Sequence, residues 1–144
     1  MTKIDGPPVV GLCAIEVLRE KFVNAGNLDE RVRVYAAARV GGPSALIFSD
    51  DLGKTWSPIN LAAAGAAMVF EVHFFDRDHG VLAAASDADL AVSNALILTI
   101  ADGGKTWAPT DSGNAVNKVR MLSTDQGTHA FSIGVGVGKN FVPK

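Results

Sequence analysis

The stretch "SDDLGKTWSP" at residues 49–58 returns with few changes as "IADGGKTWAP" at residues 100–109. Aligning the two tryptophans, Trp56 and Trp107, gives a period of 51 residues (107 minus 56). Both copies keep Asp, Gly, Lys, Thr, Trp and Pro in one order, which indicates a turn that the chain uses twice.

Two weaker echoes accompany this repeat. The segment "YAAARV" at 35–40 is similar to "LAAASD" at 82–87, and "VHFFDRDHGVLAAAS" at 72–86 to "VRMLSTDQGTHAFSI" at 119–133, each with a shift of 47 residues. The difference from the main period falls in the longer loop 86–95. Self-similarity at about 45 to 50 residues is typical of arrays of supersecondary units, propeller blades among them.

The local pattern is that of short β-strands, with runs of Val, Ile, Leu, Phe and Ala between turns rich in Gly, Asp, Asn and Pro. The segment 14–26 differs, because its apolar residues fall near one helical face and Gly26 ends it, which predicts a short helix. The residues on that face are Ile15, Leu18, Phe22 and Val23. The predicted strands are 33–40, 45–49, 54–57, 69–75, 80–86, 95–100, 105–108, 117–122 and 128–135.

Gly-Lys-Thr in both copies raises the alternative of a nucleotide-binding loop. Such a loop needs a further glycine with four residues between it and Gly-Lys-Thr, and Phe48 and Thr99 occupy those places. The sequence therefore predicts no nucleotide site and no cofactor. A structural turn fits better, because Asp accepts hydrogen bonds from its own turn, Gly supplies a positive φ, and Trp packs against a neighbouring sheet.

The segment "SDDLGKTW" resembles an Asp-box, the Ser/Thr-x-Asp-x-Gly-x-Thr-Trp hairpin repeated in β-propellers of the sialidase and photosystem II assembly factor type. The second copy has Ile100 where Ser or Thr is expected, so we expect it to lose one hydrogen bond of the turn and to be the looser copy. Residues 30–135 carry the resemblance. The residues that match the motif are Ser49, Asp51, Gly53, Thr55 and Trp56 in the first copy, and Asp102, Gly104, Thr106 and Trp107 in the second.

This resemblance implies an all-β fold of propeller-like blades in a single domain, two recognisable and one partial. Closed propellers have about 4 to 8 blades, so we expect self-association, with a homodimer favoured, to complete the ring. An open stack capped by the predicted helix and a fragment of a longer propeller are the alternatives. The expected parts of the domain 1–144 are an N-terminal segment with the helix at 1–29, blades at 30–60 and 61–110, and a partial blade at 111–144.

Composition excludes several classes of protein. With 13 basic and 15 acidic residues, the formal charge of -2 lacks the excess of cations expected of a nucleic-acid-binding protein. The only cysteine, Cys13, rules out internal disulfides and is expected to be a buried thiol. Neither the N-terminal apolar run nor the segment 61–70 is long enough for a signal peptide or a membrane span, so a cytoplasmic location is expected.

Few residues suggest chemistry. The segment "HFFDRDH" at 73–79 has two His and two Asp residues, but we interpret it as a solvated strand turn and not as a metal site. The resemblance to sialidases would imply an arginine triad and a tyrosine nucleophile, and Tyr35 is the only tyrosine. Arg39 and the loop residues Asp87 and Asp89 are the candidate binding residues.

The sequence thus predicts a noncatalytic module that binds a protein or peptide. The alternative is a glycan-binding or glycan-hydrolysing relative of the sialidase branch. Replacement of Trp56 by Ala is expected to cost roughly 3 to 5 kcal/mol if the indole lies between two blades.

Overall fold

The computed structural model describes residues 11–38, 44–89, 92–112 and 116–134, which form three antiparallel β layers. The first sheet has the order β1-β2-β3-β4, the second sheet β5-β6-β7-β8, and the C-terminal hairpin consists of β9 and β10. The strands are β1 (Leu12–Asn24), β2 (Asn27–Ala38), β3 (Ala45–Ser49), β4 (Ser57–Ile59), β5 (Met68–Phe74), β6 (Gly80–Ala85), β7 (Ala95–Ile100), β8 (Ala108–Asp111), β9 (Val116–Thr124) and β10 (Gly127–Gly134), with a 3-10 turn, η1 (Ala62–Ala64).

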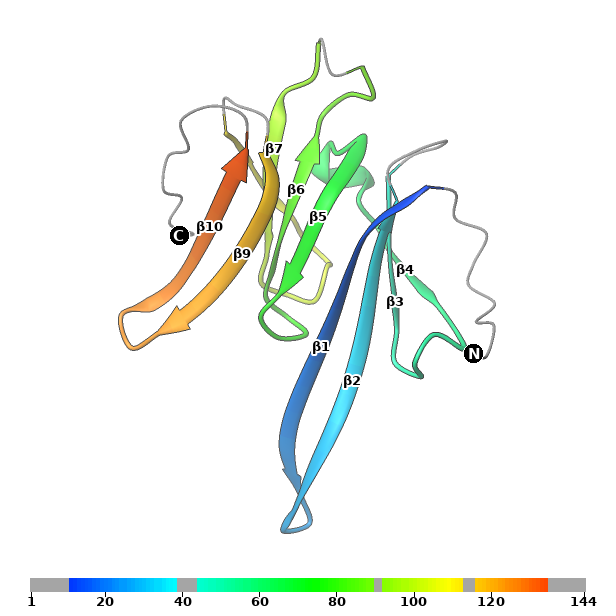
Figure 1. Cartoon of the computed structure of the whole chain (residues 1–144), viewed down its shortest axis with the longest axis vertical. Helices are drawn as coiled ribbons and strands as arrows, with labels where there is room; N and C mark the ends of the chain where they lie inside the picture. The colour runs from blue at the N-terminus through cyan, green and yellow to red at the C-terminus, as the bar shows by residue number, and fades with distance from the viewer. Residues whose placement is uncertain (1–10, 39–43, 90–91, 113–115, 135–144) are drawn as a thin grey trace.

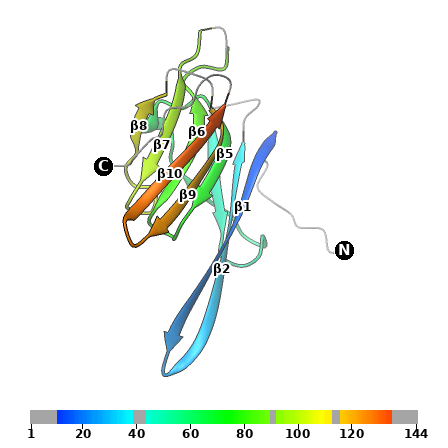
Figure 2. The ribbon, with the colours of Figure 1, turned by 60° about the vertical axis from the view of Figure 1, so that its left-hand side comes forward.

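The layers stack in chain order, with the second sheet between the other two (Figure 1, Figure 2). The first two strands of each layer pack on the first strand of the next, since β1 and β2 contact β5, and β5 and β6 contact β9. The part of the chain that the structure describes contains no helix long and apolar enough to span a bilayer.

The predicted strands are largely confirmed, and those at 45–49 and 95–100 have the predicted bounds. The strands that follow the two repeated turns begin later than predicted, at Ser57 and Ala108. The Thr and Trp of each copy belong to the turn, because the Thr N–H is bonded to the turn carboxylate and not to a neighbouring strand.

The predicted N-terminal helix is wrong, because this segment is strand β1. Ile15 and Leu18, placed on one helical face, point to opposite faces of the sheet. The following turn, Ala25-Gly26, has φ angles of 48° and 84°, which is typical of the two-residue turns that join antiparallel strands. The first sheet therefore begins at Leu12, and the expected boundary at residue 30 falls inside β2.

The β1–β2 hairpin extends well beyond the rest of the first sheet (Figure 1). The ladder between β2 and β3 reaches only from Val34–Ser49 to Ala38–Ala45, whereas β1 and β2 stay paired down to Asn24 and Asn27. Cys13 lies on β1 and is exposed, not buried as expected, and its thiol donates to the carbonyl of Val69 at 2.8 Å.

The main core lies between the first and second sheets. Tyr35 from β2 stacks on Phe74 from β5 with ring centroids 3.7 Å apart. Leu46, Leu82 and Leu98 are fully buried in the same cluster. A smaller core lies between the second sheet and the C-terminal hairpin, and it consists of Val81, Ala83, Ile97 and Val119 with Phe70 and Met121 packed against it.

One of the sequence echoes is out of register by one residue. In the first sheet Ala36 pairs with Ile47. The counterpart of Ile47 in the second sheet is Leu98, and Leu98 pairs with Leu82, not with Ala83. The structural shift from β2 to β6 is therefore 46 residues (82 minus 36), not 47. The slip matters because one residue exchanges the two faces of a strand.

Candidate functional site

The first repeated turn joins β3 to β4. The Ser49 hydroxyl accepts hydrogen bonds from the N–H groups of Gly53 at 2.7 Å and Asp51 at 3.3 Å, and donates to Asp51 Oδ1 at 2.8 Å. Asp51 also accepts from the Thr55 hydroxyl at 2.6 Å and the Thr55 N–H at 2.8 Å. These bonds, that from the Thr55 hydroxyl first, lower the pKa of Asp51 to about 2.

The second repeated turn joins β7 to β8 and keeps only the carboxylate half of this arrangement. Asp102 accepts from the Thr106 hydroxyl at 2.6 Å and from the N–H groups of Thr106 and Lys105 at 3.0 Å. The bond from the Thr106 hydroxyl is the main cause that lowers the pKa of Asp102. Ile100 replaces the serine and is buried in the main core, so the hydroxyl bonds of the first turn have no counterpart here.

The two tryptophans also differ. Trp107 packs against the main core and its indole N–H donates to the carbonyl of Asn60 at 3.1 Å, which ties the second turn to the end of the first sheet. Trp56 is half-buried, and its Nε1 is buried without a hydrogen-bond partner.

The pairing registers define equivalent positions in the three layers. In the first sheet Ile47 pairs with a residue of β2 that in turn pairs with Ile15 on β1, and in the second sheet Leu98 leads in the same way across β6 to Val72 on β5. Since Leu98 is the counterpart of Ile47 in the repeat, Ile15 and Val72 occupy equivalent places, which we call the front position. Val119 on β9 matches Val72 in the 47-residue echo. At this front position the exposed fraction of the residue is 69% for Ile15 but 1% for Val72 and Val119.

A second equivalent position lies on the opposite face. The residues that follow the front position in the chain are Glu16, His73 and Arg120. Their partners on the neighbouring strand define the rear position, and these partners are Tyr35, Val81 and Phe131. Tyr35 and Val81 are fully buried under the next layer, whereas Phe131 is 52% exposed. The two positions are thus buried inside the stack and exposed at its ends.

Each end of the stack presents an exposed apolar strip. We call Ile15 and Val17 on β1 the front strip, and Leu122, Phe131 and Ile133 on the C-terminal hairpin the rear strip. On the front face Ala36 and Ile47 are already buried, so the open surface follows β1 alone. Sequence reasoning missed both strips, although the charged residue Glu16 between Ile15 and Val17 gives a short alternation that was a signal for a strand.

Polar side chains connect the first strands of the three layers. His73 on β5 places Nδ1 3.0 Å from Glu16 Oε1 on β1 and Nε2 3.3 Å from the carbonyl of Met121 on β9. Lys118 and Arg120 on β9 both donate to Glu71 on β5 at 2.7 Å. Burial raises the pKa of Glu71, but these two cations outweigh that effect and hold the pKa below its ordinary value.

A charged network joins the projecting hairpin to the turns. Arg33 donates to both oxygens of Asp50, at 2.8 and 2.7 Å, and Arg77 bridges Asp50 and Glu20 at 3.1 and 2.8 Å. Arg31 also donates to Glu20, at 2.7 Å. The hydrogen bond from Arg33 is the main cause that lowers the pKa of Asp50. The three arginines are therefore occupied by two carboxylates of the same chain.

The candidate residues from the sequence do not converge. Tyr35 is fully buried, and desolvation raises its pKa. Arg39 lies outside the described residues. Asp87 and Asp89 lie in the exposed turn after β6, where Asp87 Oδ1 accepts from the Asp89 N–H at 2.8 Å. The two aspartates therefore help to shape their own loop.

The segment 73–79 forms a strand end and a turn. Asp76 Oδ1 accepts from the N–H groups of Asp78 and His79 at 2.8 and 2.7 Å, so Asp76 closes the turn. Among the described residues, no three His, Cys, Asp or Glu side chains are grouped as metal ligands.

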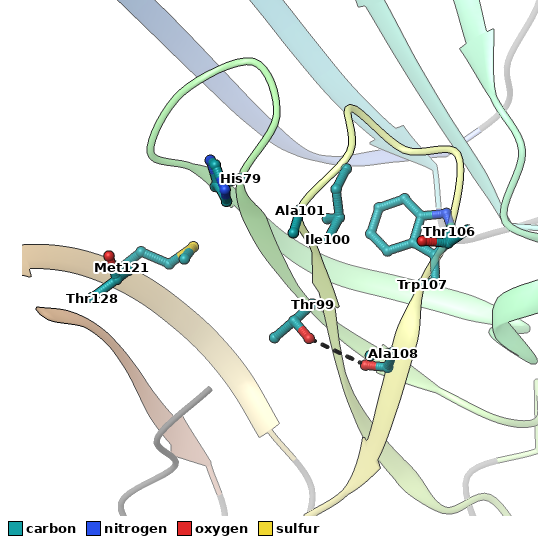
Figure 3. Close-up of a pocket in the computed structure, with 9 residues that line it drawn as sticks. All are labelled: His79, Thr99, Ile100, Ala101, Thr106, Trp107, Ala108, Met121 and Thr128. Atoms are coloured by element: carbon teal, nitrogen blue, oxygen red, sulfur yellow. Dashed lines mark hydrogen bonds between the residues drawn. The ribbon is translucent and has the colours of Figure 1, made fainter. Parts of the chain in front are cut away.

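A pocket of about 510 Å³ opens between the second sheet and the C-terminal hairpin. Figure 3 shows His79, Met121 and Thr128 on one side of it and Trp107 on the other. Thr99 and Ala108 line the part between them.

Comparison with known proteins adds no assignment: no family model, curated protein or solved structure matches this chain.

Proposed function

We propose that this chain is a noncatalytic, β-propeller-like interaction module that associates with itself and binds a protein or peptide. In this proposal the first and second sheets are Asp-box blades and the C-terminal hairpin begins a third. Each sheet is a four-stranded antiparallel meander with the Asp-box in the turn between its third and fourth strands, which supports the assignment.

The exposed strips at the two ends of the stack carry the proposal. Positions that are buried wherever two layers meet are open at both ends, and apolar surface of this kind is typical of interaction sites. Burial of both strips by a second copy or another protein would remove this surface from water, and we favour a homodimer.

Light scattering coupled to size exclusion, over a range of protein concentrations, tests the self-association. We expect a mass of twice the 15.0 kDa of the chain that persists on dilution to about 1 µM. A mass of one chain at all concentrations would contradict the proposal.

Glycan binding is the second candidate, and the pocket beside Trp107 favours it. Hydrolysis has no comparable support, because Tyr35 is buried and Arg31, Arg33 and Arg77 are paired with carboxylates. Titration with sialyllactose, followed by the NMR signal of the Trp107 indole N–H, tests this candidate. A saturable shift would favour a glycan site, and an unchanged signal would exclude this ligand from the pocket.

A further inference from the structure

We infer that two copies of this chain dock head to tail, with the rear strip of one copy on the front strip of the other. This inference rests on the proposed self-association and specifies its surfaces and polarity. The second copy presents its own front strip to the rear strip of the first, so two identical junctions close the dimer.

The two internal junctions provide the pattern for this contact. In both, the first two strands of one layer cover the first strand of the next. The C-terminal hairpin has those two strands, β9 and β10, and β1 is the strand whose front face is open. The hairpin is therefore sufficient to cover the open strip of a second copy.

Equivalent residues define the contact in more detail. Tyr35 stacks on Phe74 at the junction between the first and second sheets. Phe131 is equivalent to Tyr35, because both occupy the rear position of their layer. Val17 is equivalent to Phe74, because Val17 lies two residues after Ile15 and Phe74 two residues after Val72. A repeat of the same junction therefore places the ring of Phe131 on Val17 of the second copy.

Charge favours this polarity over a symmetric contact between identical faces. The residue that follows the front position is Glu16 in the first sheet, His73 in the second sheet and Arg120 in the C-terminal hairpin. At the junction between the first and second sheets, Glu16 Oε1 lies 3.0 Å from His73 Nδ1. The head-to-tail arrangement brings Arg120, which also donates to Glu71 of its own chain, near Glu16 of the second copy, where the charges are opposite. A rear-to-rear contact would instead bring the cluster of Lys118, Arg120 and Glu71, which has one cation in excess, near the same cluster of the other copy, and like charges oppose association.

Two blocked variants and their mixture test the polarity. Val17→Lys blocks the front strip and Phe131→Lys the rear strip, and because both positions are exposed we expect each variant to fold as a monomer. Each variant alone loses both junctions, so we expect its dimer dissociation constant to rise by at least about a hundredfold. An equal mixture retains one intact junction and forms a complex of one copy of each.

The matched control is Phe75→Lys, which changes a similarly exposed aromatic residue in the turn after β5 and leaves both strips intact. We expect it to remain dimeric, and circular dichroism with thermal unfolding checks that all variants fold. If Val17→Lys fails to fold, Ile15→Lys takes its place on the same strip.

Sedimentation velocity of the variants, alone and mixed, separates the outcomes at protein concentrations up to about 100 µM. Monomeric single variants and a dimeric mixture would establish the head-to-tail contact. A variant that stays dimeric alone, or a mixture that stays monomeric, would overturn it while leaving wild-type self-association intact. A monomeric wild type would overturn the proposed self-association as well.

Discussion

The two repeated turns have nearly the same sequence but are held by different interactions. Both keep a clamp between Thr and Asp, with a distance of 2.6 Å between hydroxyl and carboxylate oxygens in each turn. The first turn adds the hydroxyl of Ser49, which bonds to the backbone and to Asp51. The second turn has Ile100, which is buried in the main core.

This difference shows that the first position of the repeated turn accepts either a polar or an apolar side chain. Ser49 and Ile100 are both buried, so a polar side chain there must find partners and an apolar one must find packing. The Asp–Thr clamp is the part that both turns share. Whether the second turn is looser, as expected from the loss of the hydroxyl, stays a prediction.

The largest expected effect separates the two tryptophans. Trp107→Ala removes packing on the main core and a hydrogen bond, and is expected to lower the free energy of unfolding by about 3 kcal/mol. Both indoles are half-buried, but Trp56→Ala is expected to cost about half as much, because Trp56 is not among the residues packed against the main core and its buried Nε1 has no partner. Urea denaturation measures both, and equal costs would contradict the distinction.

Restoring the motif in the second turn is expected to destabilise the protein. Ile100→Ser supplies the missing hydroxyl but removes a buried side chain from the main core, for a net cost of about 2 kcal/mol. The matched change Ser49→Ala removes the hydroxyl from the first turn and is expected to cost about 1 kcal/mol. A gain in stability for Ile100→Ser in urea denaturation would show that the hydroxyl outweighs the burial.

A smaller effect, of opposite sign, is expected at the residue after the Asp. Leu52 has a φ of 60° and is exposed, whereas the second turn has Gly103 with a φ of 72° at the same place. Leu52→Gly removes the steric cost of the left-handed conformation and is expected to raise the melting temperature, with a gain of about 0.5 kcal/mol. A decrease in melting temperature would mean that Leu52 makes contacts of its own.

The smallest effect concerns pH. The pKa of Asp51 lies at about 2, below its ordinary value of 3.8, so its carboxylate stabilises the fold above about pH 4 and this contribution is lost as the pH falls towards 2. Ser49→Ala removes one of the bonds that lower the pKa, and is expected to raise the pKa of Asp51. NMR titration of the carboxyl carbon measures this value, and an unchanged pKa would mean that Ser49 does not stabilise the carboxylate.

The sequence was most informative where a motif fixes local geometry. The repeated turns followed from Asp, Gly, Thr and Trp at fixed spacing, and the strands before them from apolar runs bounded by turn residues. The all-β class was implied by the resemblance that this motif carries, together with the pattern of short strands. The helix predicted at 14–26 failed because Leu18 and Phe22 match a helical face as well as a strand face. The pairing of β1 with β2, the strand that follows after the Ala25-Gly26 turn, decides between the two, and the pattern of the segment alone does not show it.

The candidate site was harder to predict because it depends on which faces the layers cover. Ile15 and Val72 are both aliphatic residues on a first strand, and only the stacking of the layers buries Val72 and leaves Ile15 open. The one-residue difference between the sequence echo and the true match of β2 to β6 also becomes visible only when the pairing of the strands is known. Sequence similarity alone had aligned Ala36 with Ala83, which lie on opposite faces of their sheets.

The most direct test of the central claim is an isotope-filtered NOE experiment on an equal mixture of 13C-labelled and unlabelled chains. It reports only contacts between copies. The head-to-tail arrangement predicts NOEs between the ring protons of Phe131 in one copy and the methyl groups of Val17 in the other. NOEs between Phe131 residues of the two copies, or no intermolecular NOE to either strip, would contradict it.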